Sequence, residues 1–316
     1  MPIPNTPGIA ETATKFIKLT PIVRTHYGFG YRETGLTNWY SSQILRLNST
    51  RASPKVNKSR LILSSTGVLL GNYLVYSHCN EAWWQEERTR FHLYRGWRRS
   101  RGWWDFGWHD SLYFHMDKWG HFYCARLLSE LMRDLSTWVG FNKQSASIIG
   151  PLISSLLMLE IEVYDGFFKE WGFSLGDFTA NEVGAIFPVL QDRFDFLKKL
   201  NLKLSYHRSG EPTADKYFIK DYAGMTFWLC YDIKDDLPNP LGQFWPRFLN
   251  LGLGYSVTKQ VRGELELYLA PDVNWYQILP HNNKFLTAVE KWLNFIHFPC
   301  LTWQLTPREK LHTIYF

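Results

Sequence analysis

The period of the hydrophobic pattern changes near residue 203, and this change constrains the fold more than any other feature of the chain. Before that point, apolar positions recur with helical spacing. After it, apolar and polar residues alternate, which is the pattern of β-strands. Helices followed by strands predict an α+β protein, in which a bundle of about four helices precedes an antiparallel β-rich C-terminal half.

The first half contains four candidate helices. Gly140 is expected to close the second of them, and Pro151 lies in the first turns of the third. The four are LILSSTGVLLGNYLVYSHCNEAWW (61–84), DKWGHFYCARLLSELMRDLSTWVG (117–140), SASIIGPLISSLLMLEIEVYDGF (145–167) and a helix from Ser174 through LGDFTANEVGAIFPVLQDRF.

The second half contains several candidate strands and one short helix, NKFLTAVEKWLNFI. The terminal Tyr315 and Phe316 are typical of outer-membrane barrels, but about five or six strands are too few to close one. The candidate strands are KYFIKDYAGMTFWLCYDI (216–233), FLNLGLGYSVT (248–258), RGELELYLAPDV (262–273), LTWQL (301–305) and HTIYF (312–316).

Three regions follow from these patterns. Residues 1–58 are mixed and polar, and we expect a poorly structured N-terminal extension there. Residues 59–200 are expected to form a helical domain, and residues 201–316 a β-rich region packed on it. At 316 residues the chain is long enough to bury a sizeable core.

The composition favours a membrane surface over nucleic acid as a partner. Aromatic residues make up 17% of the chain, with 15 Trp, and the formal net charge is +6. Basic and aromatic residues alternate within 95–104, which would suit anionic lipid head groups, although a solvated loop explains the same pattern. No nucleic-acid motif accompanies the charge. The apolar stretches 61–76 and 146–159 are shorter than the roughly 20 residues that span a bilayer, which favours buried or half-inserted helices.

The four cysteines have neither the spacing of a zinc site nor that of a disulfide framework. The N-terminus shows no continuous apolar run of the kind that a signal peptide requires.

Three of the candidate helices each carry a polar pair on one face. The members of each pair are three or four residues apart and therefore lie on the same side of the helix. If the three faces converge, they form a cluster of carboxylates with one imidazole, one ammonium and one amide. The candidate site residues are Asp117, Lys118, His121, Glu162, Asp165, Asp177 and Asn181.

Such a cluster could act in two ways. His121, Glu162, Asp165 and Asp177 offer nitrogen and oxygen ligands that a divalent metal would accept, or one carboxyl group could be held at a raised pKa for acid–base chemistry. The structural alternative is a buried network in which Lys118 compensates the two acids that end the third helix. Ser174 is interpreted as the N-cap of the fourth helix.

Three motifs in this region resemble an uncharacterised family of predicted periplasmic lipoproteins, the domain of unknown function 2279. They are D-K-x-G-H (117–121), I-E-x-x-D-G (161–166) and W-G-F-S-x-G-D-x-x-A-N-x-x-G (171–184). Further segments, R-x-x-F-H (88–92), K-D-Y-x-G-x-T-F-W-L (220–229) and the ending around Phe298, resemble the longer members from the Bacteroidetes. The resemblance thus covers about residues 60 to 316. A more distant likeness is to VanZ-type membrane proteins.

The resemblance implies a location in the bacterial cell envelope, periplasmic and membrane-associated, but no reaction. Two functional hypotheses therefore stay open. The first is a structural or lipid-interacting envelope component whose polar cluster specifies helix packing. The second is an enzyme, a hydrolase or transferase, that acts on a lipid-linked or envelope substrate through the His and carboxylate cluster, with a divalent metal as a candidate cofactor.

Overall fold

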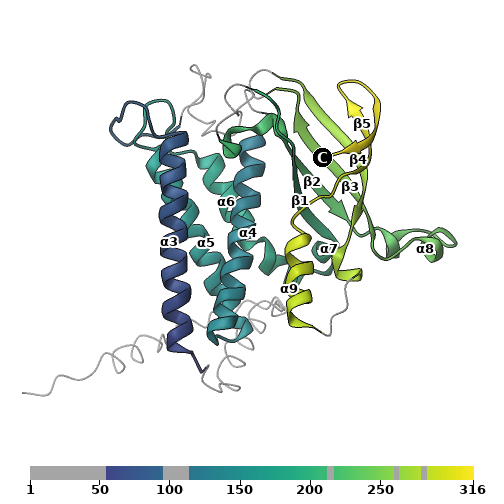
Figure 1. Cartoon of the computed structure of the whole chain (residues 1–316), viewed down its shortest axis with the longest axis horizontal. Helices are drawn as coiled ribbons and strands as arrows, with labels where there is room; N and C mark the ends of the chain where they lie inside the picture. Colours follow the sequence, from purple (N-terminus) through teal and green to yellow (C-terminus); the bar gives the residue numbers. More distant parts are fainter. Residues whose placement is uncertain (1–54, 95–113, 212–216, 260–262, 279–282) are drawn as a thin grey trace, which may run out of the picture. The chain divides into compact units, whose positions relative to one another are not determined.

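Helices occupy the first part of the described chain and a single sheet occupies the second (Figure 1). The computed structural model describes residues 55–94, 114–211, 217–259, 263–278 and 283–316. The arrangement confirms the α+β prediction. Most of the expected N-terminal extension, and the basic and aromatic segment 95–104, lie outside the described residues.

Four long helices form the helical part, and their ends follow local capping rules. They are α3 (Lys58–Ala82), α4 (Met116–Val139), α5 (Lys143–Asp165) and α6 (Leu175–Arg193). The side chain of Asn142 caps α5 by accepting a hydrogen bond from the Ser145 N–H at 2.7 Å. Gly140 ends α4 with φ of 113°, a left-handed conformation that favours glycine, as the sequence predicts.

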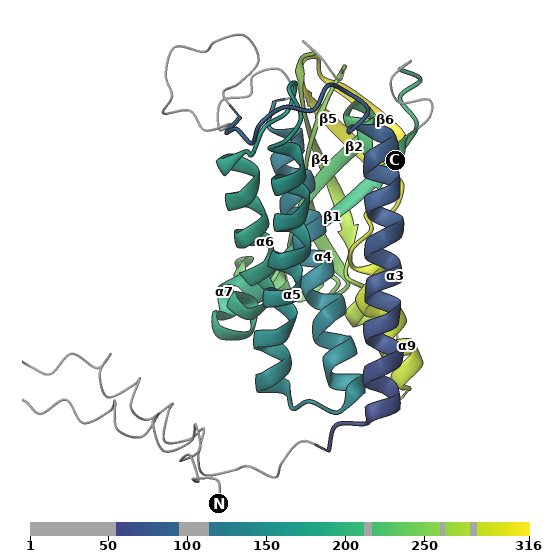
Figure 2. The same cartoon turned by 90° about the vertical axis from the view of Figure 1, so that its left-hand side faces the viewer.

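Helix α4 is the centre of the helical part, because small residues let its neighbours approach closely. Ser154 of α5 donates a hydrogen bond to the Ala125 carbonyl of α4 at 2.7 Å. Gly184 of α6 lies against the α4 backbone, where an added Cβ would meet the Phe122 carbonyl oxygen at 2.3 Å. Figure 2 shows α5 and α6 in front of α4, with the strands behind it.

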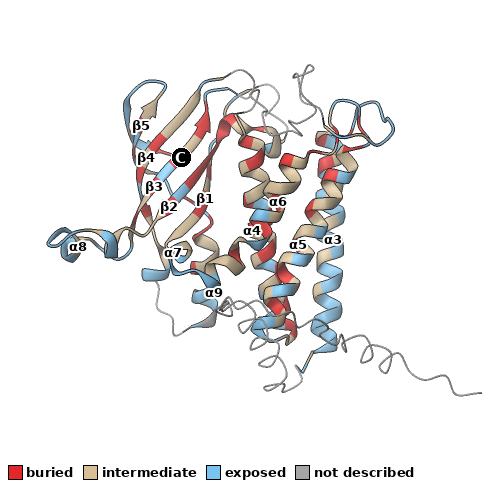
Figure 3. Cartoon of the chain, turned by 180° about the vertical axis from the view of Figure 1, so that it is seen from behind, coloured by how far each residue is buried: buried red, intermediate tan, exposed pale blue. Residues whose placement is uncertain are grey.

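Helix α3 is attached mainly at its two ends. Its buried residues are Cys79 and Ala82, near its C-terminus. At its N-terminus the Asn57 N–H donates to the Val139 carbonyl at 2.9 Å, and the Arg60 guanidinium donates to the Trp138 carbonyl at 3.0 Å. Figure 3 shows how little of the remaining helix is buried.

The sheet is an antiparallel meander of six strands in chain order. One of its faces packs on α4, where Met116 and Tyr123 meet Phe227 and other apolar residues of the first three strands. A second core contains Trp228, Tyr268 and Tyr315. The strands are β1 (Leu200–Tyr206), β2 (Met225–Tyr231), β3 (Leu249–Val257), β4 (Leu265–Val273), β5 (Cys300–Thr306) and β6 (Lys310–Tyr315).

Shorter elements connect the long ones. They are α7 (Asp195–Lys198), α8 (Leu241–Phe244), α9 (Lys284–Leu293) and the 3-10 turns Phe218–Lys220, Tyr222–Gly224, Lys234–Asp236 and Trp275–Gln277.

Two strand predictions need correction. The strand expected over 216–233 begins only at Met225, because two 3-10 turns wrap around the buried Asp221, whose carboxylate accepts hydrogen bonds from the Ser209 and Gly224 N–H groups. The strand β1 was not among the predicted strands. Its sequence, LNLKLSY, alternates apolar and polar residues as a strand does. Its central residue is Lys203, however, which is buried although it is charged.

Candidate functional site

The N-terminal turn of α4 holds a buried ammonium between two carboxylates. Lys118 is 8% exposed, and its Nζ lies 2.6 Å from Asp117 Oδ2 and 2.6 Å from Asp177 Oδ1 of α6. Burial alone would lower the pKa of Lys118, but the two carboxylates outweigh it and raise that pKa. The ammonium therefore stays charged and joins α4 to α6.

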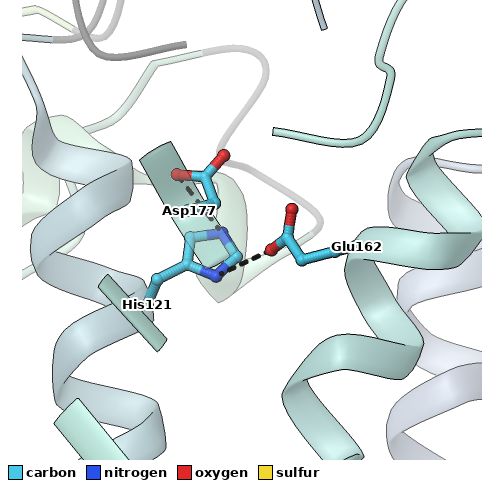
Figure 4. Close-up of side chains that lie close together, drawn as sticks. All are labelled: His121, Glu162 and Asp177. Carbon is cyan, nitrogen blue, oxygen red and sulfur yellow. Dashed lines mark ion pairs between the residues drawn. The ribbon is translucent and has the colours of Figure 1, made fainter. Parts of the chain in front are cut away.

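One turn further along α4, His121 contacts α5 and α6 (Figure 4). Its Nδ1 lies 3.0 Å from Asn181 Oδ1 and 3.3 Å from Glu162 Oε1, and its Nε2 lies 4.0 Å from Asp177 Oδ1. Asn181 Nδ2 donates to Glu162 Oε1 at 3.2 Å. The imidazole thus lies between a carboxylate of α5 and a carboxylate of α6.

Local sequence places Asp177 in the first turn of α6. Ser174 is the N-cap, and its hydroxyl accepts a hydrogen bond from the Asp177 N–H at 3.1 Å, as predicted. The Asp177 carboxylate contacts Lys118 of α4. Burial would raise the pKa of Asp177, but His121 and Lys118 outweigh burial and lower it.

Glu162 is the most deeply buried acid of the cluster. It is 1% exposed, and its Oε2 has no hydrogen-bond partner among the described residues. Burial first, and then the nearby charges of Asp177 and Asp165, raise the pKa of Glu162 well above its ordinary value. The hydrogen bond from Asn181 and the contact with His121 each offset part of the cost of burying this carboxyl group.

Asp165 lies on the same helix but turns toward α3. Its Oδ1 accepts a hydrogen bond from the Trp84 indole N–H at 2.6 Å. Burial raises the pKa of Asp165 to about 7, although the Trp84 hydrogen bond opposes this shift. Trp84 is a partner that the sequence reasoning missed, because nothing in the local pattern relates the end of α3 to the end of α5.

The predicted site residues therefore separate into two groups. Six of the seven form one continuous set of contacts, and the seventh, Asp165, bonds to Trp84 instead. Lys118 contacts neither Glu162 nor Asp165. Its partners are Asp117 and Asp177, so the network around Lys118 differs from the expected one. The six are Asp117, Lys118, His121, Glu162, Asp177 and Asn181.

One subset has the composition of a metal site. Ligand atoms of His121, Glu162 and Asp177 all lie within 4.8 Å of one another. One imidazole nitrogen and two carboxylates suit divalent transition metals. Glu162 Oε2, which accepts no hydrogen bond from the described residues, has its lone pairs available to coordinate a metal ion. Asp165, the fourth predicted ligand, is not part of this subset.

Comparison with known proteins supports the resemblance stated from the motifs. Residues 101–193 match the model of a family described as predicted periplasmic lipoprotein (DUF2279). The match covers less than a third of the chain, but it contains all seven predicted site residues. The comparisons with curated proteins and with solved structures found no significant match. The family description is consistent with an envelope protein and brings no reaction with it.

Proposed function

We propose that the protein is a membrane-associated component of the cell envelope, and that the outer surface of α3 lies against lipid. The observation that carries the proposal is the exposure of α3, which has 25 residues and apolar side chains on most of its sides. A helix that is apolar all round is usually buried in a large core or in a membrane. Its exposed apolar residues are Leu61, Ile62, Leu63, Leu69, Leu70, Tyr73, Leu74 and Val75.

Helix α5 supports the same proposal. Among the described residues, it is the one helix long and apolar enough to cross a membrane, by length and composition alone, and most of it is unburied in the chain. Helix α5 is 23 residues long, so it continues beyond both ends of the apolar stretch 146–159. Ile148, Leu152 and Leu156 are exposed at four-residue intervals, so they form one apolar stripe on its outer face.

Charge at one end of these helices suits an anionic lipid surface. Lys58 and Lys143 are exposed at the N-terminal ends of α3 and α5, near the C-terminus of α4. The Arg60 guanidinium lies 5.2 Å from the centre of the Trp138 ring in the same region. Basic and tryptophan side chains are favoured at the membrane–water interface.

Vesicle flotation tests the proposal. The protein should float with vesicles that contain phosphatidylglycerol, and added salt should weaken the binding, because salt screens surface charge. Ile62→Gln combined with Leu69→Gln should lower the partition coefficient at least tenfold, since each apolar side chain contributes about 1.5–3 kcal/mol and glutamine adds no charge. Both positions are well exposed, so the substitutions should not affect folding.

Phe244→Gln is the matched control, because Phe244 is 83% exposed and lies on α8, between β2 and β3 in the chain. It should leave flotation unchanged. If the wild-type protein stays monomeric in buffer without detergent and does not float, the proposal is wrong.

A second candidate function rests on Glu162. We infer that His121, Glu162 and Asp177 bind a divalent transition metal, because their ligand atoms converge and the second Glu162 oxygen is buried without a hydrogen-bond partner. Metal bound there would support the hydrolase or transferase hypothesis, and its absence would favour a cluster that only specifies helix packing.

Metal analysis after dialysis against Zn²⁺ or Mn²⁺ decides between these alternatives. Stoichiometric retention by the wild-type protein, and at least tenfold weaker binding by Glu162→Gln, are expected, because an amide is a much poorer ligand than a carboxylate. Asp165→Asn is the matched control on the same helix and should retain the metal, since Asp165 bonds to Trp84. Equal metal content in the wild type and Glu162→Gln would contradict the metal site.

A further inference from the structure

A polar cleft lies apart from the cluster, where α4, α6, β1 and α9 meet. Its volume is about 110 Å³. A single water needs roughly 10–15 Å³ by the same measure, so the cleft has room for a small ion and a few waters. Four basic side chains and two acidic ones line it, namely Arg126, Lys198, Lys199 and Lys291 against Glu130 and Asp232.

The inner wall of the cleft contains a buried cation without a carboxylate partner. Arg126 is 6% exposed, and none of the carboxylates of the described residues lies within ion-pair distance of its guanidinium. Its Nη1 donates to the Leu202 carbonyl at 2.6 Å and its Nη2 donates to Asn201 Oδ1, while its Cζ lies 4.6 Å from the centre of the Phe295 ring. The Nε–H has no hydrogen-bond partner there. A buried charge of this kind is costly unless an opposite charge accompanies it.

Two asparagines that line the cleft each have one side-chain polar atom without a hydrogen-bond partner among the described residues. The hydrogen bonds that each amide does make identify this remaining atom. Asn294 accepts hydrogen bonds at Oδ1 from Lys203 Nζ and from the Trp275 N–H, so its unpaired atom is the donor Nδ2. Asn250 donates from Nδ2 to Asp272 Oδ2 at 3.2 Å, so its unpaired atom is the acceptor Oδ1. Both residues are almost fully buried.

We propose that this cleft binds a small oxyanion that carries a hydroxyl group, of which inorganic phosphate is the simplest example. Arg126 Nε and Asn294 Nδ2 would donate to the anion, and Asn250 Oδ1 would accept from its hydroxyl. Lys291 pairs with Glu130 at 2.6 Å and with Asp134 at 2.8 Å, so it neutralises acids that would otherwise repel an anion in the cleft. The three unpaired atoms and the uncompensated guanidinium then gain partners together.

The Asn250 acceptor predicts a preference that charge alone would not produce. Phosphate retains at least one O–H group at mildly acidic pH, whereas sulfate has none under the same conditions. Sulfate would therefore leave Asn250 Oδ1 unpaired and opposed to an anionic oxygen. Because about 1.4 kcal/mol corresponds to a factor of ten, we expect phosphate to bind at least tenfold more tightly than sulfate.

Isothermal titration calorimetry of the full-length protein with phosphate and with sulfate tests the site. Arg126→Met should weaken phosphate binding at least tenfold, and Lys291→Met should weaken it several-fold. Lys169→Met is the matched control, because it removes the same charge from an exposed lysine outside the cleft, and it should bind phosphate as the wild type does.

Three results would overturn the inference. The first is the absence of saturable phosphate binding, which would mean that the cleft holds water only. The second is equal affinity for phosphate and sulfate. The third is an equal loss of phosphate affinity in Lys291→Met and Lys169→Met. Arg126→Met removes two hydrogen bonds to β1, to Asn201 and to Leu202, and requires a thermal-unfolding check. If it does not fold, Lys291→Met and the comparison of the two anions still decide the outcome.

Discussion

Two carboxyl groups of α5, those of Glu162 and Asp165, are tolerated in the interior because each has its own hydrogen-bond partner. Glu162 lies beside His121 and Asn181 with a strongly raised pKa, and Asp165 accepts a hydrogen bond from Trp84. Lys118, the compensating charge expected from the sequence, pairs with Asp117 and with Asp177 of α6. Hydrogen bonds from Asn181 and Trp84 therefore take the place of the expected ion pair with Lys118 on α5.

Asp165 makes the stability of the fold depend on pH. Its folded-state pKa of about 7 exceeds the ordinary value, because of burial and the nearby Asp177 charge. As pH rises, the unfolded chain loses this proton first, so the folded state holds an extra proton up to about pH 7 and stability falls over that interval. For one proton the slope is about 1.4 kcal/mol per pH unit.

Asp165→Asn should make this slope shallower, because an amide does not titrate and its oxygen still accepts the Trp84 hydrogen bond. Glu162 shifts in the same direction, so part of the slope should remain. Urea unfolding of both proteins between pH 5 and pH 7 provides the measurement. An identical slope in the two proteins would show that Asp165 titrates normally.

At the scale of the elements, close contact between helices brings the cluster together. Gly184 of α6 lies against the α4 backbone one turn after Asn181, so a side chain there would separate the two helices. Gly184→Ala should lower the free energy of unfolding by about 1–3 kcal/mol, the usual cost of overpacking. The cause is the Phe122 carbonyl, a backbone atom that cannot rotate away.

Gly67→Ala is the comparison substitution. Gly67 is also within a helix, α3, but an added Cβ there meets nothing within 4 Å. It should leave stability unchanged or raise it by up to about 1 kcal/mol, because alanine is the better helix former. Chemical unfolding of the two variants measures the difference, and similar losses in both would mean that the α4–α6 approach does not limit stability.

Helical spacing made part of the candidate site predictable. Residues four apart are separated by about 40° around a helix, so Asp117 with His121, and Asp177 with Asn181, face the same neighbours. Residues three apart differ by about 60° in the opposite sense, and this is enough for Asp165 to turn to Trp84 while Glu162 turns to His121. Spacing within one helix could not reveal which helices are neighbours.

The fold was predictable to a similar extent. Caps and turn residues gave the helix ends to within a few residues, as at Gly140 and Ser174. The strand β1 was missed because a buried Lys203 contradicts the usual preference of lysine for the surface. Its ion pair with Asp272 at 2.9 Å, together with hydrogen bonds to the Val273 carbonyl and to Asn294, explains its position. That pairing joins residues far apart in the chain.

At the scale of the whole molecule, the central claim is that α3 lies against lipid. Photolabelling of the vesicle-bound protein with a diazirine reagent confined to the bilayer, followed by peptide mapping, tests it most directly. We predict modification of the exposed apolar positions of α3, such as Ile62 and Leu69, and none of Phe244, which is exposed on α8. Labelling of Phe244 with α3 left unmodified would contradict the account.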